Sequence, residues 1–164
     1  MKNLILDSEQ IIQKIQRLSY EIYENNLSEK NIILLGLKKN GYLLSKQIKK
    51  HLDRLFTYKV KLFQLKIEKD LFIVDNSKLN FTKEDISNKV IIIIDDVLNS
   101  GKTIAYSVGS ILPYLPKKIE VAVLVDRSYK NYPILAKYRG LELNTTINEH
   151  VEIDLDKELV GYLY

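Results

Sequence analysis

The sequence contains no cysteine among its 164 residues. This absence excludes a disulfide scaffold, a zinc site built on thiolates and a cysteine nucleophile. The chain also lacks an apolar stretch of the roughly 20 residues that cross a bilayer, so we expect a cytoplasmic protein that does not enter a membrane. Repeats and low-complexity segments are missing too, and the length suits a single domain spanning residues 1–164.

What the chain does contain is an ordinary globular composition with a small surplus of positive charge. Hydrophobic residues make up 46% of the sequence and charged residues 28%, which is typical of a folded domain with a buried core. Lysine and arginine number 25 against 21 acidic residues, giving a net charge of +4. This balance is compatible with RNA or with phosphorylated small molecules, although an ordinary lysine-rich surface is the simpler explanation.

The most informative segment joins an apolar run to two carboxylates and a short polar turn. Residues 90–94 read Val-Ile-Ile-Ile-Ile, which predicts a strand buried on both faces, as in a parallel sheet covered by helices. Asp95 and Asp96 follow at the strand's carboxyl end, where open α/β sheets bind ligands. A helical pattern starts at Thr103 and predicts inward-facing side chains at Ile104, Val108, Ile111, Leu112 and Leu115. Residues 100–103 therefore lie at a helix N-terminus, whose free N–H groups attract anions.

This combination predicts a sugar-phosphate site, with carboxylates for hydroxyl groups and a helix N-terminus for phosphate. Two carboxylates alone often mark only a solvated strand end, and a polar turn alone is often only a capped turn. Here they follow each other in strand-turn-helix order, which favours a single site. Gly101, Lys102 and Thr103 also match the end of a Walker A loop, which requires a glycine five residues before Gly101. Asp96 occupies that position, which argues against a P-loop nucleoside triphosphatase.

Strands and helices alternate along the rest of the chain. The first predicted helix is capped by Asp7 or Ser8 and faces inward with Ile11, Ile12, Ile15, Leu18 and Ile22. The other predicted elements are a strand at 31–35, a turn at 36–41, a helix at 42–55, a covered strand at 120–125 and an edge strand at 151–155. This alternation predicts an α/β fold with a central, mainly parallel sheet flanked by helices.

Two segments interrupt the alternation. The apolar pattern of residues 58–67 changes phase between Leu62 and Phe63, which suggests a β-bulge or a strand that leaves the sheet. Residues 70–88 are polar, and their length suits a flexible flap over the site or, equally, a plain connecting hairpin.

The segment from Asp95 to Thr103 resembles the phosphoribosyl pyrophosphate (PRPP) signature of type I phosphoribosyltransferases. Within that superfamily, the chain is most similar to the pyrimidine-operon attenuator and uracil phosphoribosyltransferase (PyrR) family. The similarity includes residues 4–7, residues 35–43 and residues 122–127, followed by Tyr132-Pro133-Ile134. It covers nearly the whole chain. It implies the type I phosphoribosyltransferase fold, with a small hood that includes part of residues 127–146 and a flexible flap.

The resemblance also implies which residues form the site. Asp95, Asp96, Asp126 and Arg127 would be the catalytic residues, and the three aspartates would bind Mg²⁺. Arg127 would add positive charge near the pyrophosphate. The implied PRPP-binding residues are Leu37, Lys38 and Lys39 for the pyrophosphate, Asp95 and Asp96 for the ribose hydroxyls, and Asn99, Ser100, Gly101, Lys102 and Thr103 for the 5′-phosphate.

The implied reaction is displacement of pyrophosphate from C1′ of PRPP by a nitrogen of a nucleobase. Mg²⁺ and lysine would neutralise the leaving group, so no covalent nucleophile is needed. Purine phosphoribosyltransferases commonly carry aspartate at the position of Asn99, and an amide cannot act as a general base. Asn99 therefore favours a pyrimidine, with uracil as the simplest expectation.

Departures from the family pattern keep a second function open. Residues 38–41 read Lys-Lys-Asn-Gly where the PyrR family usually has Lys-Thr-Arg-Gly, so an arginine is lost. Residues 100–103 read Ser-Gly-Lys-Thr instead of Thr-Gly-Arg-Thr, which preserves hydroxyl and charge. The alternative is a regulator that binds RNA, or a sensor of PRPP or nucleotides, with little catalytic activity. In either case the resemblance implies a homodimer or a larger assembly.

Overall fold

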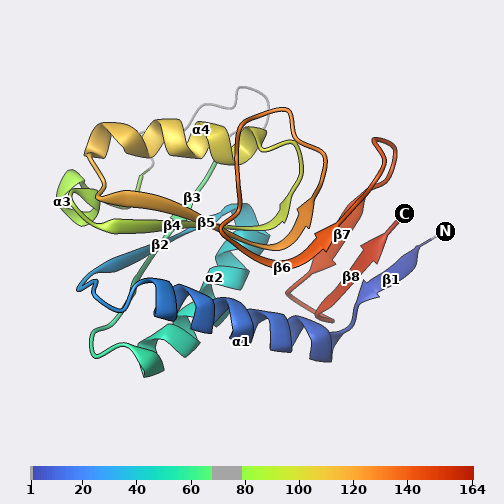
Figure 1. Ribbon diagram of the computed structural model, residues 1–164, viewed down its shortest axis with the longest axis horizontal. Coiled ribbons are helices and arrows are strands. Elements are labelled where there is room, and N and C mark those ends of the chain that lie inside the picture. The colour runs from blue at the N-terminus through green and yellow to red at the C-terminus, as the bar shows by residue number, and fades with distance from the viewer. Residues whose placement is uncertain (1, 68–78) are drawn as a thin grey trace.

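A five-stranded sheet forms the centre of the computed structural model, which describes residues 2–67 and 79–164 (Figure 1). In chain order the elements are β1 (Asn3–Leu6), α1 (Ser8–Asn25), β2 (Ile32–Leu37), α2 (Lys38–Leu55), β3 (Lys61–Leu65), α3 (Lys83–Ile86), β4 (Val90–Leu98), α4 (Lys102–Ile111), the 3₁₀ helix η2 (Leu112–Tyr114), β5 (Lys118–Arg127), β6 (Tyr138–Leu143), β7 (Val151–Asp154) and β8 (Val160–Leu163). The central sheet has the order β3-β2-β4-β5-β6, and every pair in it is parallel. A second sheet, called the small sheet below, is antiparallel with the order β1-β8-β7.

The central strands are buried because their side chains alternate between two hydrophobic clusters, one on each face. Leu34, Ile92 and Leu124 pack with residues of α1 and α2. The residues that alternate with them along the strands, such as Ile93 and Val123, face the other side and pack with residues of α3 and α4. Figure 1 shows α1 and α2 on one side of the sheet and α4 on the other. The predicted α/β fold, with a parallel sheet flanked by helices, is confirmed.

α1 and α4 begin within one residue of the predicted positions, but some of their apolar positions face solvent. Asp7 caps α1 through a reciprocal pair of hydrogen bonds with Gln10. Ile12 was expected to face inward and is instead 53% exposed. Leu112 and Leu115, expected on the inner side of α4, are also exposed. Proline at position 113 cannot continue an α-helix, so α4 ends at Ile111 and the chain turns into η2.

The prediction of a bulge within residues 58–67 is wrong. β3 pairs with β2 in an unbroken parallel register from Lys61 to Leu65. Leu62 packs against the cluster under α1 and α2, whereas Phe63 and Leu65 belong to the cluster under α4. The change of phase therefore reflects the two covered faces of one regular strand.

The prediction of a turn at residues 36–41 is also wrong. β2 continues to Leu37 and α2 begins at Lys38, four residues earlier than expected. The change of direction falls on Lys38, whose backbone has a φ of 53°. This left-handed conformation is uncommon for a residue other than glycine, asparagine or aspartate, and such strain clusters at functional sites.

The predicted hood is present as the small sheet, but the residues expected to form it contribute no strand to that sheet. Part of residues 127–146 forms β6, which joins the central sheet, whereas the small sheet is built from segments near both chain ends. The edge strand predicted at 151–155 is confirmed as β7, at one edge of the small sheet. Residues 70–78 of the predicted flap lie outside the described residues, and the other part of it, residues 79–88, carries α3. None of the helices in residues 2–67 and 79–164 combines the length and hydrophobicity that crossing a bilayer requires.

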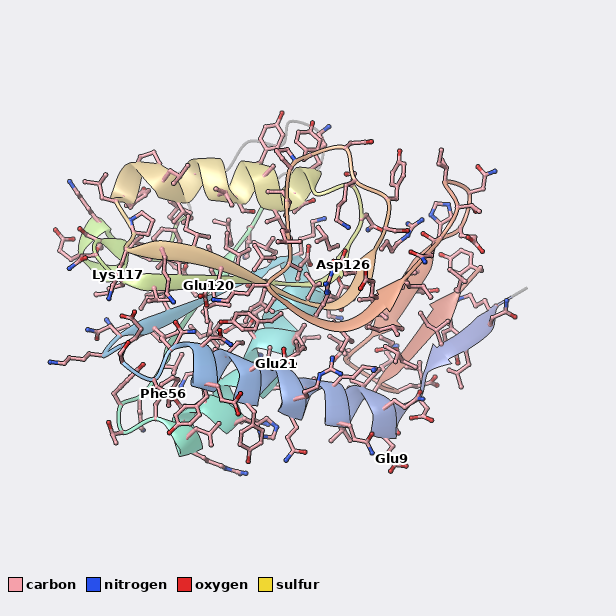
Figure 2. The ribbon with its side chains drawn as sticks, viewed as in Figure 1. Glu9, Glu21, Phe56, Lys117, Glu120 and Asp126 are labelled. Atoms are coloured by element: carbon pink, nitrogen blue, oxygen red, sulfur yellow. The ribbon has the colours of Figure 1, made fainter. Side chains whose placement is uncertain are left out.

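A buried charge network secures the amino end of β5, where Glu120 lies at the opposite end of the strand from Asp126 (Figure 2). The Glu120 carboxylate accepts hydrogen bonds from Lys118 (2.9 Å), Lys137 (2.8 Å) and the Tyr138 hydroxyl (2.7 Å). Burial alone would raise the pKa of Glu120, but these donors lower it to about 2. The ionised carboxylate is therefore the stable form in the fold.

Replacement of Glu120 by glutamine should remove part of the pH dependence of stability. Because the folded pKa is about 2 against an ordinary 4.5, the ionised group stabilises the fold above about pH 4.5 and this contribution is lost as the pH falls. We expect the native chain to lose about 2 kcal/mol more than Glu120→Gln between pH 7 and pH 3. Urea unfolding at both pH values measures this difference, and equal losses would contradict the assignment.

Candidate functional site

A pocket of about 100 Å³ lies between the carboxyl end of β4 and the N-terminus of α4. It is lined by Lys38 and by every residue from Asp95 to Ile104. The pairing of β2 with β4 stops at Ile94, whereas β5 stays paired with β4 as far as Leu98. β4 is thus longer than predicted, and its two carboxylates lie next to the point where β2 ends and α2 begins.

The two carboxylates of the pocket have different environments. Asp95 is 6% exposed, while Asp96 is half-buried. The backbone N–H of Asp96 donates to Asp95 Oδ1 (3.0 Å), and that of Val97 donates to Asp96 Oδ1 (2.9 Å). Burial raises the pKa of Asp95 well above its usual range, and the charge of Asp96 raises it further, whereas Lys38 opposes the shift. Hydroxyl donors or a cation would stabilise the ionised pair.

The turn after β4 is shaped to receive an anion. Gly101 occupies the N-cap of α4 with a φ of 85° and provides no side chain to cap the helix. A Cβ at Gly101 would lie 3.2 Å from the Cβ of Ile134, so the segment after β5 packs closely over the turn. The same segment donates the backbone N–H groups of Asn131 and Tyr132 to the Ser100 carbonyl (2.9 and 3.0 Å). The uncapped end of α4 therefore offers N–H groups on a firmly held turn.

Only part of the predicted pyrophosphate segment reaches the pocket. Lys38 lines it, whereas Leu37 is fully buried in the core and can contribute only its backbone. The Lys39 side chain is 72% exposed, and its Nζ lies 2.6 Å from Asp156 Oδ2, in the turn after β7. Lys39 thus contacts the small sheet and does not line the pocket.

Asp126 is buried at the end of β5 but is already paired with cations. Its Oδ1 accepts a hydrogen bond from Lys130 Nζ (2.5 Å), and Arg139 lies 3.6 Å from its Oδ2. The described ranges hold no group of three or more His, Cys, Asp or Glu that could bind a metal ion alone. Mg²⁺ usually takes one or two carboxylates together with substrate phosphates and water. The carboxylate oxygens of Asp95 and Asp96 are suitable ligands for a magnesium ion whose other ligands are substrate phosphates and water.

Arg127 holds the surrounding chain together. Its side chain is buried, and its guanidinium donates to Thr145 Oγ1 (2.7 Å), Asn99 Oδ1 (2.8 Å), the Thr146 carbonyl (3.0 Å) and the Glu149 carbonyl (2.8 Å). Arg127 therefore fastens the segment before β7 to the turn after β4. A guanidinium has only donors, so the Asn99 amide must present its oxygen to Arg127 and its Nδ2 elsewhere.

Sequence reasoning missed Asn40 as a contributor to the site. Its Nδ2 donates to Asp96 Oδ2 (2.8 Å) and to the Ile153 carbonyl of β7 (2.9 Å). Position 40 was considered only as a lost arginine, and no local pattern indicates a contact with a residue 113 positions away. The glycine that follows gave the only available signal, because glycine within a helix often marks a close approach of two backbones.

Comparison with known proteins gives a consistent result over nearly the full chain. The model of the phosphoribosyl transferase domain family matches residues 2–158. The chain is 36% identical to the bifunctional protein PyrR of Fusobacterium nucleatum, over 96% of this chain and 93% of the relative. It is 34% identical to the bifunctional protein PyrR of Haemophilus ducreyi, over 93% of this chain and 89% of the relative.

Solved structures share the fold at much lower identity. The hypoxanthine phosphoribosyltransferase of Trypanosoma cruzi has a TM-score of 0.78 and 16% identity, with 98% of this chain and 95% of that chain covered. A hypoxanthine-guanine phosphoribosyltransferase from Bacillus anthracis has a TM-score of 0.75 and 16% identity, with 99% and 96% covered. At this level of identity, both structures support the architecture alone.

The contacts of Arg127 predict that its loss destabilises the fold. Arg127→Met should lower the free energy of unfolding by about 3 kcal/mol, because the buried guanidinium makes four partly buried hydrogen bonds that methionine cannot make. Arg127→Lys should restore only a minor part of this loss, since an ammonium cannot reproduce the planar fork of a guanidinium. Urea denaturation of the three proteins gives the values. An Arg127→Met protein as stable as the native chain would refute this structural role.

Proposed function

Because this chain belongs to the phosphoribosyl transferase domain family, we propose that its pocket binds PRPP and transfers the phosphoribosyl group to a nucleobase, with release of pyrophosphate. The observation that carries the proposal is the adjacency of Asp95 and Asp96 to the uncapped N-terminus of α4 in one pocket. Carboxylates accept hydrogen bonds from vicinal hydroxyls, and helix N–H groups bind phosphate. A sugar phosphate needs both within a few ångströms of each other.

The roles of the pocket residues follow from their positions. Asp95 and Asp96 bind the ribose hydroxyls, and residues 99–103 surround the 5′-phosphate with backbone N–H groups and hydroxyls. Lys38, at the strained start of α2, lines the same pocket and would contact the pyrophosphate. Its charge, together with Mg²⁺ bound through Asp95 or Asp96 and the substrate, would neutralise the leaving group.

We propose uracil as the acceptor base. Asn99 lines the pocket, and Arg127 occupies its amide oxygen, so the amide offers hydrogen-bond donors to a ligand. Donors of this kind complement the carbonyl oxygens of uracil. The PyrR relatives, at 36% and 34% identity, favour the same base. Two further proposals accompany this function: a cytoplasmic location and a homodimer or larger assembly.

A sensor of PRPP or nucleotides is the second candidate, and the ion pairs of Asp126 favour it. Lys130 and Arg139 already balance the charge of Asp126, the third carboxylate predicted to bind magnesium. A site with this pairing can bind the sugar phosphate through Asp95 and Asp96 without completing the metal environment for catalysis. Binding of RNA would belong to this second candidate.

Pyrophosphate release separates the two candidates. The full chain is incubated with PRPP, Mg²⁺ and each of uracil, cytosine, hypoxanthine and guanine, and pyrophosphate is followed over time. We expect turnover with uracil to exceed that with the other bases by at least about 10-fold, and chelation of magnesium with EDTA to abolish it. Binding of PRPP without turnover on any base would favour the sensor.

The double replacement Asp95→Asn with Asp96→Asn tests the carbohydrate contact. PRPP affinity should fall by at least about 100-fold, because two hydrogen-bond acceptors lose their charge. The fold should persist, since amides of the same shape relieve the repulsion between two crowded carboxylates. Isothermal titration calorimetry gives the affinity and thermal unfolding checks the fold. Glu142→Gln, an exposed carboxylate on β6, serves as the matched control. Unchanged affinity in the double variant would refute the site.

A further inference from the structure

Asn40 connects the ribose-binding carboxylate to the small sheet. The amide nitrogen has two hydrogens, and the structure gives each an acceptor: Asp96 Oδ2 at 2.8 Å and the Ile153 carbonyl at 2.9 Å. The other oxygen of Asp96 accepts the Val97 N–H at 2.9 Å. Both oxygens of Asp96 therefore have a donor, which defines the plane of its carboxylate.

The first turn of α2 lies unusually close to β4, and this brings Asn40 within reach. A Cβ on Gly41 would stand 2.5 Å from the Ile94 carbonyl oxygen and 3.3 Å from Asp95 Oδ1. Any larger residue at position 41 would push the helix away from the strand. Asn40, one residue earlier, is partly buried between Asp96 and β7.

The second acceptor belongs to a firmly packed strand. Ile153 is buried and shares a hydrophobic cluster with Ile94 and Val97 of β4. β7 pairs with β8, and β8 pairs with β1, so the carbonyl that accepts from Asn40 is held by the whole small sheet. An amide fixed at this end cannot rotate away from Asp96.

We propose that Asn40 is a positioning residue, which holds Asp96 in the orientation that binds the ribose hydroxyls of PRPP by bracing it against β7. The proposal rests on the proposed function, because it concerns the affinity of the same pocket for PRPP. A simpler role would be to fasten α2 to the small sheet with no effect on the ligand. The ion pair between Lys39 and Asp156 joins the same two parts of the fold, at 2.6 Å, and touches neither pocket carboxylate. It supplies a matched control.

The experiment is a double-mutant cycle on PRPP affinity, measured on the full chain with Mg²⁺ by isothermal titration calorimetry. Asn40→Ala should weaken PRPP by about 10-fold, because Asp96 loses the hydrogen bond that orients it. Asp96→Asn should weaken PRPP by about 10-fold as well, because the acceptor loses its charge. If Asn40 acts through Asp96, Asn40→Ala should change affinity by less than about twofold in the Asp96→Asn background. Asp156→Asn, which disrupts the neighbouring ion pair, should leave the affinity of the native chain unchanged.

Two results would overturn the inference. One is an equal loss of affinity from Asn40→Ala in the native and Asp96→Asn backgrounds, which would show independent action. The other is an equal loss from Asn40→Ala and Asp156→Asn, which would reduce Asn40 to a fastener of the small sheet. If Asn40→Ala does not fold, Asn40→Asp keeps the side-chain shape and replaces the donor by an acceptor, and the same cycle applies. Failure of the native chain to bind PRPP would overturn the proposed function itself, whereas binding with no effect of Asn40 would overturn this inference alone.

Discussion

The structure around the pocket depends on the placement of two adjacent carboxylates at a buried strand end. A chain segment as apolar as residues 90–94 can cross the middle of the molecule because both faces of β4 are covered. The same covering removes water from Asp95, where ionisation is costly and the next residue carries a like charge. The charge of Lys38 and the Asp96 N–H moderate this cost at Asp95, while the Val97 N–H and the Asn40 amide donate to the Asp96 carboxylate. The carboxylate oxygens of Asp95 and Asp96 can accept further hydrogen bonds from a ligand.

The two ends of the central sheet show how differently the fold can treat buried acid groups. Glu120 has two lysines and a tyrosine around it, and the fold keeps it ionised with a low pKa. At the other end, the burial of Asp95 on the neighbouring strand raises its pKa instead. A satisfied network stabilises the fold, whereas an incompletely compensated carboxylate is a feature of binding sites. This contrast locates the site at the carboxyl end of the sheet without reference to any motif.

Local patterns predicted most of the architecture and the core of the pocket. The apolar run before Asp95, the glycine at 101 and the periodicity of α1 are short-range signals, and the structure places them as expected. The errors come from contacts between distant residues. Ile12 fits the helical pattern but is 53% exposed, because no element among the described residues covers it. The contact of Lys39 with Asp156 likewise depends on β7 lying beside α2, and the role of Lys39 toward pyrophosphate stays a prediction. β1, β6 and β8 received no prediction, because short strands acquire their pairing from segments that the local sequence does not reveal.

The strand order of the small sheet determines when this sheet can form during synthesis on the ribosome. β8 lies between β1 and β7, and its residues 160–163 pair with Asn3 to Leu6 on one side and with Val151 to Asp154 on the other. β1 can therefore pair with β8 only after residues 160–163 have been synthesised. The strands of the central sheet end at Leu143, so all of them are synthesised before β8. The Ile153 carbonyl that accepts from Asn40 belongs to this sheet, so the side of the pocket next to Asn40 is complete only when residues 160–163 are present.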